Sequence, residues 1–311
     1  MLKTGIQSRL LLGDKAGEKD FRRIKEAGFN CIDFNLDCFL PNKLIYKGEI
    51  NHFFDRNPEE LTAFFREYYA MASEEDLEFS QAHAPYPLYV HGREADREYL
   101  HMVAEKSIAV CAALRAPYLV IHPLKLSYSS GKKEEYRENM KFFESLIPLS
   151  KEYGVKICLE NLYESFGGRL CEGVCADPYE AVEYLDGLNR AAGEECFAFC
   201  FDTGHANLFG KNMREVIGIL GNRLQALHIH DNDGAADLHH LPFTFTKELA
   251  GEASTDWDGF VCGLRDVGYH GVLSFETFGA LQCFPKELHD SVLRMIADIG
   301  EYWARILDEE V

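Results

Sequence analysis

Residues 197–205 read FAFCFDTGH, so that five apolar residues are followed directly by Asp202 and, three positions later, by His205. A continuous apolar run of this length is typical of a strand that is buried on both faces. Such a strand does not carry a charge at its end unless another group compensates that charge. The segment therefore predicts a buried strand whose last residue belongs to a functional site.

Five other segments end in the same way, with a histidine or a carboxylate after an apolar run. They are FSQAHAP (79–85), YLVIHP (118–123), KICLEN (156–161), LQALHIHDN (224–232) and GVLSFETF (271–278). The simplest arrangement that compensates all these strand ends is a single site at which they converge on a metal ion.

Helical stretches separate these strands along the whole chain. We expect strands at residues 3–8, 30–35, 78–83, 118–122, 156–160, 197–202, 224–228 and 271–276, and helices at 19–27, 58–75, 95–114, 133–153, 178–188, 213–220, 257–267 and 286–307. Strands that alternate with helices pair in parallel, and eight such units predict an α/β fold of the (β/α)8 TIM-barrel type, with residues 1–311 as one domain. An open, doubly wound sheet is the alternative, but no glycine-rich phosphate turn follows the first strand.

The composition excludes several classes of protein. A formal net charge of −19, without a run of more than two Lys or Arg residues, argues against a nucleic-acid partner. No apolar stretch reaches the roughly 18 residues of a membrane span, and the N-terminal apolar run is too short for a secretion signal, so a cytoplasmic location is expected. The ten cysteines have neither zinc-finger nor redox spacing, and we expect them to be free core thiols.

Four strand ends in a row carry the strongest metal ligands: Glu160, Asp202, His228 and Glu276. Three carboxylates this close would repel one another and raise each other's pKa, whereas a divalent cation compensates them. Taken alone, an aspartate can cap a helix and a histidine can be a satisfied core residue; their joint occurrence on four consecutive strands favours a metal site. One imidazole among carboxylates suits Mn, Mg or Co, and Zn is also compatible.

A second set of polar residues lies at or beyond the strand ends. These residues could hold additional metal ions, or they could bind a polyol substrate and orient the metal ligands: His83, His122, His205, Asp237 and His239. We favour the second interpretation, because the acidic chain lacks the basic groups of multi-metal phosphate chemistry. Asn161 and Asp231 are expected to support substrate binding beside His83, His122 and His205.

Two long connections are expected to cover the carboxyl ends of the strands. Residues 37–57 contain four aromatic side chains, and residues 235–255 carry Asp237 and His239. Loops of this length commonly act as lids or binding loops.

Six motifs follow one another along the chain: LENLYE (159–164), FDTGHANLFG (201–210), LHIHDNDG (227–234), DLHHLPF (237–243), TDW (255–257) and GYHGVLSFE (268–276). In this order they resemble the xylose isomerase-like TIM barrel superfamily, in particular its sugar phosphate isomerase/epimerase branch. The resemblance implies metal ligation by the four strand-end residues. It also implies proton transfer by Glu160 and Glu276 through a metal-stabilised enediolate of a sugar or sugar phosphate. The chain departs from the 3-epimerases of this branch, which have glutamate and arginine where it has Asp231 and Gly234.

Two alternatives remain open. Endonuclease IV, from the same superfamily, binds three zinc ions, and all nine of its ligand types have counterparts in the residues named above. The net charge argues against this DNA enzyme. The chain could also be a metal-stabilised sugar-binding protein without turnover, and the sequence leaves open whether it forms a homo-oligomer.

Overall fold

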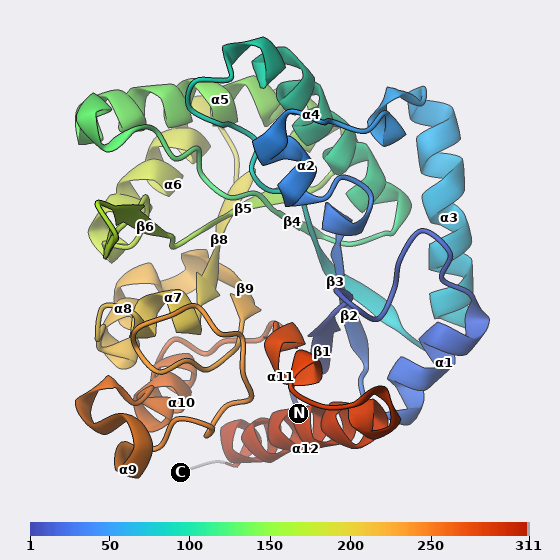
Figure 1. Ribbon diagram of the computed structural model, residues 1–311, viewed down its shortest axis with the longest axis vertical. Helices are drawn as coiled ribbons and strands as arrows, with labels where there is room; N and C mark the ends of the chain where they lie inside the picture. Colours follow the sequence, from blue (N-terminus) through green and yellow to red (C-terminus); the bar gives the residue numbers. More distant parts are fainter. Residues whose placement is uncertain (310–311) are drawn as a thin grey trace.

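Eight parallel strands form the centre of the computed structural model, which describes residues 1–309 (Figure 1). They are β1 (Thr4–Gln7), β2 (Cys31–Asn35), β3 (Glu78–His83), β4 (Tyr118–Val120), β5 (Lys156–Glu160), β8 (Phe197–Asp202), β9 (Leu224–His228) and β10 (Leu273–Phe275), in the order β10-β1-β2-β3-β4-β5-β8-β9. Ile229 joins the two outer members, since its N–H donates to the Ser274 carbonyl at 2.9 Å and its carbonyl accepts from the Glu276 N–H at 3.0 Å. The expected TIM-barrel fold is confirmed.

Helices surround the strands, as Figure 1 shows. Eight of them connect or follow the strands: α1 (Glu18–Glu26), α3 (Pro58–Glu74), α4 (Arg97–Ala113), α5 (Lys132–Tyr153), α6 (Pro178–Ala192), α8 (Met213–Leu220), α10 (Trp257–Asp266) and α12 (His289–Asp308). Each agrees with an expected helix, and α6 runs four residues further, to the left-handed Gly193. Four short helices lie in the connections: α2 (Asn42–Lys47), α7 (Thr203–Asn207), α9 (Lys247–Ala250) and α11 (Phe278–Gln282).

A short antiparallel hairpin was not anticipated. Strands β6 (Tyr163–Phe166) and β7 (Arg169–Glu172) pair directly after β5. Gly167 and Gly168 form its turn with φ of 59° and 75°. A Gly-Gly pair between two short β-prone runs was the available signal, because a two-residue turn of this kind requires positive φ at both positions.

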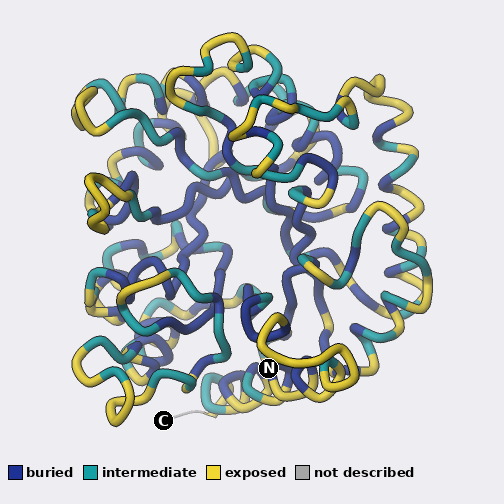
Figure 2. The backbone as a smooth tube through the Cα atoms, in the orientation of Figure 1, coloured by how far each residue is buried: buried dark blue, intermediate teal, exposed yellow. Residues whose placement is uncertain are grey.

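Side chains alternate between the inside and the outside of the barrel. On β8, Phe197, Phe199 and Phe201 belong to the core between the strands and the helices, and Phe197 contacts the Phe143 ring of α5. Ala198 and Cys200, which lie between these phenylalanines, face inward. Small side chains of neighbouring strands fill the barrel interior with them: Val120, Cys158 and Ala226. Figure 2 shows the inner strands as continuously buried. Both faces of the strands are buried, as the continuous apolar runs predict.

The ten cysteines are free thiols, as expected, and six of them are buried. Cys158 and Cys200 lie inside the barrel, where thiols act as small apolar side chains. Among the helices of residues 1–309, none is both long and apolar enough to cross a membrane.

The connection after β2 differs from the expected lid. Phe39 and Phe54 are buried and belong to the main core, and Phe39 packs on Phe65 of α3 with ring centroids 5.1 Å apart. Only Tyr46 of its four aromatic residues is largely exposed. Phe39 and Phe54 therefore stabilise the packing of α3, whereas Asp37, Asn42 and Tyr46 of the same segment line the spaces at the carboxyl ends of the strands.

Candidate metal centre

Strand periodicity brings the predicted ligands to the same end of the barrel, where they take part in several overlapping groups rather than in a single one. Side chains two residues apart on a strand face the same side, so Cys158 and Glu160, or Cys200 and Asp202, both point into the barrel. Cys158 and Cys200 fill the barrel interior, whereas Glu160 and Asp202 lie at the carboxyl ends of their strands. In TIM barrels this end carries the active site.

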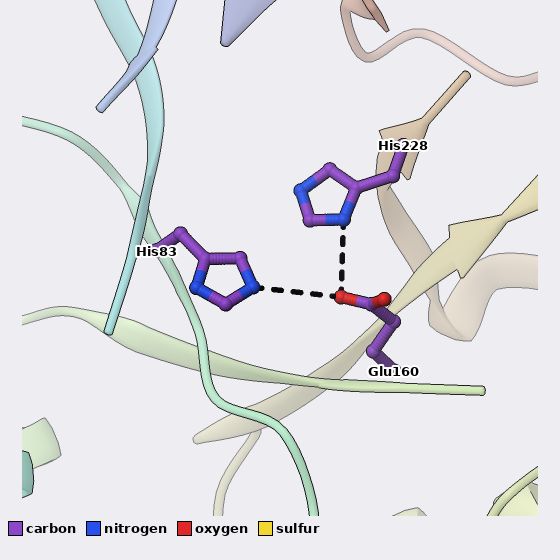
Figure 3. A group of neighbouring side chains, drawn as sticks. All are labelled: His83, Glu160 and His228. Carbon is purple, nitrogen blue, oxygen red and sulfur yellow. Dashed lines mark ion pairs between the residues drawn. The ribbon is translucent and has the colours of Figure 1, made fainter. Parts of the chain in front are cut away.

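His228, Glu160 and Glu276 meet at the centre of this site. His228 Nδ1 lies 3.0 Å from Glu160 Oε2 and 3.2 Å from Glu276 Oε2. Neither His228 Nδ1 nor Glu160 Oε2 has a hydrogen-bond partner within residues 1–309, although both atoms are buried. Buried polar atoms without a partner are costly, and a cation bound to both atoms would remove this cost. Their arrangement therefore suits two ligands of one metal ion. Figure 3 shows His228 and His83 directed at this carboxylate oxygen.

The opposite nitrogen of His228 contacts Asp33, a residue of β2. His228 Nε2 lies 3.0 Å from Asp33 Oδ2, and both side chains are fully buried. A carboxylate only accepts at neutral pH, so Nε2 donates to Asp33, and in the neutral ring that binds a metal ion Nδ1 keeps its lone pair. This arrangement is typical of metal-binding histidines. Asp33 was missed in the sequence, where a carboxylate inside the apolar strand NCIDFN was its signal.

Three further histidines follow the same rule through backbone carbonyl groups. In each of them Nδ1 donates to a backbone carbonyl. The pairs are His83 with Ala84 (2.7 Å), His205 with Asn161 (2.8 Å) and His239 with Glu276 (3.0 Å). A carbonyl oxygen only accepts, so each Nε2 is free to act as a ligand in the neutral ring.

The first of these Nε2 atoms forms a group with His122 and Glu160. His83 Nε2 and His122 Nε2 are 3.1 Å apart, and they lie 3.8 and 3.2 Å from Glu160 Oε2. Burial, together with His122 and His228, lowers the pKa of His83 to about 3, so the ring is neutral. Glu160 Oε2 thus lies between His228 and the pair formed by His83 and His122.

Asp237 connects the other two histidines. Asp237 Oδ2 lies 3.1 Å from His239 Nε2 and 3.5 Å from His205 Nε2. His230, which the sequence analysis did not select, stacks on His239 with ring centroids 4.0 Å apart. The two-residue step from His228 to His230 was the signal, since it places both rings on the inner face.

Asp202 contributes to the site and also caps a helix. Its Oδ1 accepts from the His205 N–H at 2.6 Å, at the start of α7, and lies 3.0 Å from His230 Nε2. Gly204 makes room for this contact, because a Cβ at that position would lie 1.9 Å from His230 Cε1. Burial raises the pKa of Asp202, but His205 and His230 outweigh burial and lower it overall.

The two glutamates differ in their electrostatic surroundings. Burial raises the pKa of Glu276 to about 7 despite His228 and His239. At Glu160 burial has the same sign, but His122 and His228 hold the pKa well below its ordinary range. The site thus contains one carboxyl group that favours ionisation and one that resists it.

A cavity of about 400 Å³ lies above these groups. Seven predicted site residues line it: His83, His122, Glu160, His205, Asp237, His239 and Glu276. Its wall also contains two cations, Arg9 and Lys125, and the aromatic residues Tyr86, Tyr163 and Phe278. This volume is at the lower end of small-molecule sites.

Two residues expected to contact substrate do not line this cavity. The Asn161 amide pairs with the Asp202 backbone, donating to its carbonyl and accepting from its N–H, each at 2.8 Å. The Asp231 carboxylate accepts from the Thr255 hydroxyl at 2.6 Å and from the Phe245 N–H at 3.1 Å. Their polar atoms are satisfied by the protein, so they position the strand end and the 235–255 connection instead.

A family model describing the xylose isomerase-like TIM barrel matches residues 21–299. The chain belongs to this family. The uncharacterized protein MJ1311 of Methanocaldococcus jannaschii is 29% identical over 203 residues, which are 64% of this chain and 60% of that protein. Inosose isomerase of Bacillus velezensis is 23% identical over 189 residues, 59% of this chain and 62% of that protein. The matched region thus spans only about three-fifths of the length of these relatives.

Solved structures share the fold. A D-tagatose 3-epimerase-like protein has a TM-score of 0.71 at 19% identity, covering 99% of this chain and 98% of that one. The 3-keto-D-glucoside 4-epimerase of E. coli has a TM-score of 0.69 at 16% identity, covering 98% and 100%. A D-psicose 3-epimerase determined in the presence of D-fructose has a TM-score of 0.66 at 15% identity, covering 98% and 99%.

Proposed function

We propose that this protein is a divalent-metal-dependent isomerase or epimerase of a ketose sugar or a ketose phosphate. The observation that carries the proposal is the convergence of His228 Nδ1, Glu160 Oε2 and Glu276 Oε2 beneath a cavity of about 400 Å³. The names of the relatives support the same class, because inosose isomerases and a D-psicose 3-epimerase are among them.

The metal ligands in this proposal are Glu160, Asp202, His228 and Glu276. A divalent ion held by them would supply Lewis acidity to a substrate carbonyl. One glutamate removes the proton from the carbon next to the carbonyl, and the electron pair of that C–H bond moves towards the carbonyl oxygen. The other glutamate returns a proton, either to the opposite face or to the neighbouring carbon.

The remaining cavity residues would bind the sugar and exclude water. His83, His122 and His205 line the cavity and would contact hydroxyl groups of the sugar. Asp231 stands where the 3-epimerases of the family have a glutamate, and its carboxylate is held by Thr255 and Phe245 outside the cavity. We therefore do not propose a C3 epimerisation in particular.

The test is incorporation of solvent deuterium into ketoses. Protein loaded with Mn²⁺ is incubated in D₂O with a panel of ketoses and their phosphates, and C–H signals are followed by NMR. We expect exchange with at least one sugar and its loss, by at least about 10²-fold, in Glu160→Gln and Glu276→Gln. Glu183→Gln, an exposed site on α6, is the matched control and should exchange like the wild type.

One observation favours a second candidate function, that of an endonuclease IV-like phosphodiesterase with three metal ions. The histidines around the central group could complete two further sites, one at His83, His122 and Glu160 and one at Asp237 and His239 with His205 or His230. The net charge of −19 opposes DNA binding. Counting metal ions per chain by elemental analysis and assaying cleavage of abasic-site DNA separate the two functions. Metal and sugar binding without exchange would instead identify a non-catalytic sugar-binding protein.

A further inference from the structure

A second and larger groove opens beside the cavity of the candidate metal centre. Its volume is about 700 Å³. Four residues line both spaces, namely Asn42, Tyr86, Lys125 and Tyr163. The two spaces are therefore neighbours that share this part of their walls.

Segments from four parts of the chain form this outer groove. They are α2, residues 86–91, the connection after β4 at 123–129, and strand β6 of the hairpin that follows β5. Figure 1 shows α2 and the connection from β4 to α5 on the same side of the barrel. The groove is thus built by connections at the carboxyl ends of β2 to β5, where TIM barrels bind substrates.

Two exposed aromatic rings stack on each other at this groove. The ring centroids of Tyr128 and Phe166 are 4.3 Å apart with an interplanar angle of 19°. Their side chains remain 65% and 56% exposed. The pair contributes little to the core, and exposed apolar surface that lines a groove commonly marks a binding site.

Hydrogen-bonding groups lie where the two spaces meet. Lys125 Nζ is 4.8 Å from the centroid of the Tyr163 ring and 5.5 Å from that of Tyr86. Among the ion pairs and hydrogen bonds of residues 1–309, none involves this ammonium group, whose neighbours are these two rings. The Tyr46 and Tyr86 hydroxyl groups are 3.4 Å apart at the same place. A ligand passing from one space to the other would meet donors on a largely aromatic wall.

We infer that the outer groove binds a second sugar ring, so that the substrate is a glycosylated ketose rather than a free monosaccharide. This inference rests on the proposed function, which places the ketose in the cavity of the candidate metal centre. A pyranose ring presents apolar C–H faces and a rim of hydroxyl groups, which match the Tyr128–Phe166 pair and the polar residues Asn42 and Ser165 of the groove. Glu164 lines the groove together with Lys125, so the two charges balance and the groove has no excess of positive charge for a phosphate.

The test compares D-fructose with two ketoses that carry a second ring, isomaltulose and lactulose. Their binding to the Mn²⁺-loaded protein is measured by calorimetry, and solvent deuterium exchange is measured in parallel. We expect at least one disaccharide to bind about tenfold more tightly than D-fructose, since covering one apolar ring face is worth about 1.4 kcal/mol. The double variant Tyr128→Ala/Phe166→Ala should reduce this advantage to about twofold or less and leave D-fructose binding unchanged.

Tyr179→Ala is the matched control, because this tyrosine is 67% exposed on another helix and should leave all three affinities unchanged. Disaccharides that bind no more tightly than D-fructose, or an advantage that survives in the double variant, would overturn the inference. Exchange into D-fructose in that case would leave the proposed function standing. Tighter disaccharide binding without exchange into any sugar would support the groove and contradict the proposed function.

Discussion

The aspartate that contacts His228 from β2 offers a sharp test of the metal centre. Replacing Asp33 by Asn keeps the shape of the side chain and removes its charge. Asp33 Oδ2 accepts from His228 Nε2 at 3.0 Å and from Gln81 Nε2 at 3.1 Å, and all three side chains are buried. Loss of the charge weakens the preference for the His228 tautomer that leaves Nδ1 free towards Glu160.

The size of the effect follows from this geometry. A hydrogen bond to a charged group contributes about 1.5–3 kcal/mol. Because each 1.4 kcal/mol or so is a factor of ten in affinity, Asp33→Asn should weaken metal binding by about 10- to 100-fold. In known metal sites, replacing the residue that orients a ligating histidine lowers metal affinity by about the same factor.

The assay is competition between the metal-free protein and a chromophoric chelator for Mn²⁺ or Zn²⁺ at fixed pH. Circular dichroism verifies that the variant is folded. Asp55→Asn is the matched control, because Asp55 Oδ2 lies 2.7 Å from His52 Nδ1 on the exposed surface. An Asp33→Asn affinity within about threefold of the wild type would refute the argument that Asp33 prepares His228 for a metal ion.

Three other outcomes are expected. A metal at 100 times its dissociation constant should stabilise the wild type by about 2.7 kcal/mol, seen as a higher melting temperature by calorimetry; Glu160→Gln should lose most of this increase. Trp303→Ala should lower the free energy of unfolding in urea by about 3–5 kcal/mol, because the indole is 2% exposed and stacks on Phe275; a loss below about 1 kcal/mol would contradict that packing. Burial raises the pKa of the Cys158 thiol, so a disulfide reagent should label exposed Cys283 in the native protein and Cys158 only after unfolding; rapid labelling of Cys158 would contradict the closed barrel interior.

Local sequence predicts the inner face of the barrel well. The two-residue period of a strand decides which side chains point inward, and an apolar run that ends in a charge marks the end that faces the site. The same period implies that Asp33 and His230 face inward too. The sequence analysis missed Asp33 because it lies within a strand rather than at its end. It missed His230 because this residue follows His228, which had been assigned as the ligand of its strand.

For the connections, sequence reasoning was right only in part: both long ones contribute residues to the cavity, but individual side chains were placed wrongly. Asn161 follows Glu160 directly and faces the other way, so its amide pairs with the Asp202 backbone. The aromatic residues at 37–57 were expected to form a lid, but Phe39 and Phe54 pack into the core with α3. Burial in such segments depends on how the chain folds back on a neighbouring helix, here α3, and their own sequence does not encode this.

The sequence by itself determined that eight strands alternate with helices and that Glu160, Asp202, His228 and Glu276 lie at one end of them, because strand periodicity and parallel pairing are local consequences of the apolar pattern. Only the tertiary structure decided that Asp237 contacts His205, that backbone carbonyls orient three imidazoles, and that the β6–β7 hairpin forms the wall of a second groove. Except for the contact of His83 with the neighbouring Ala84 carbonyl, these contacts join segments far apart in the chain. The order of residues along a strand cannot specify how its loops fold back over its end.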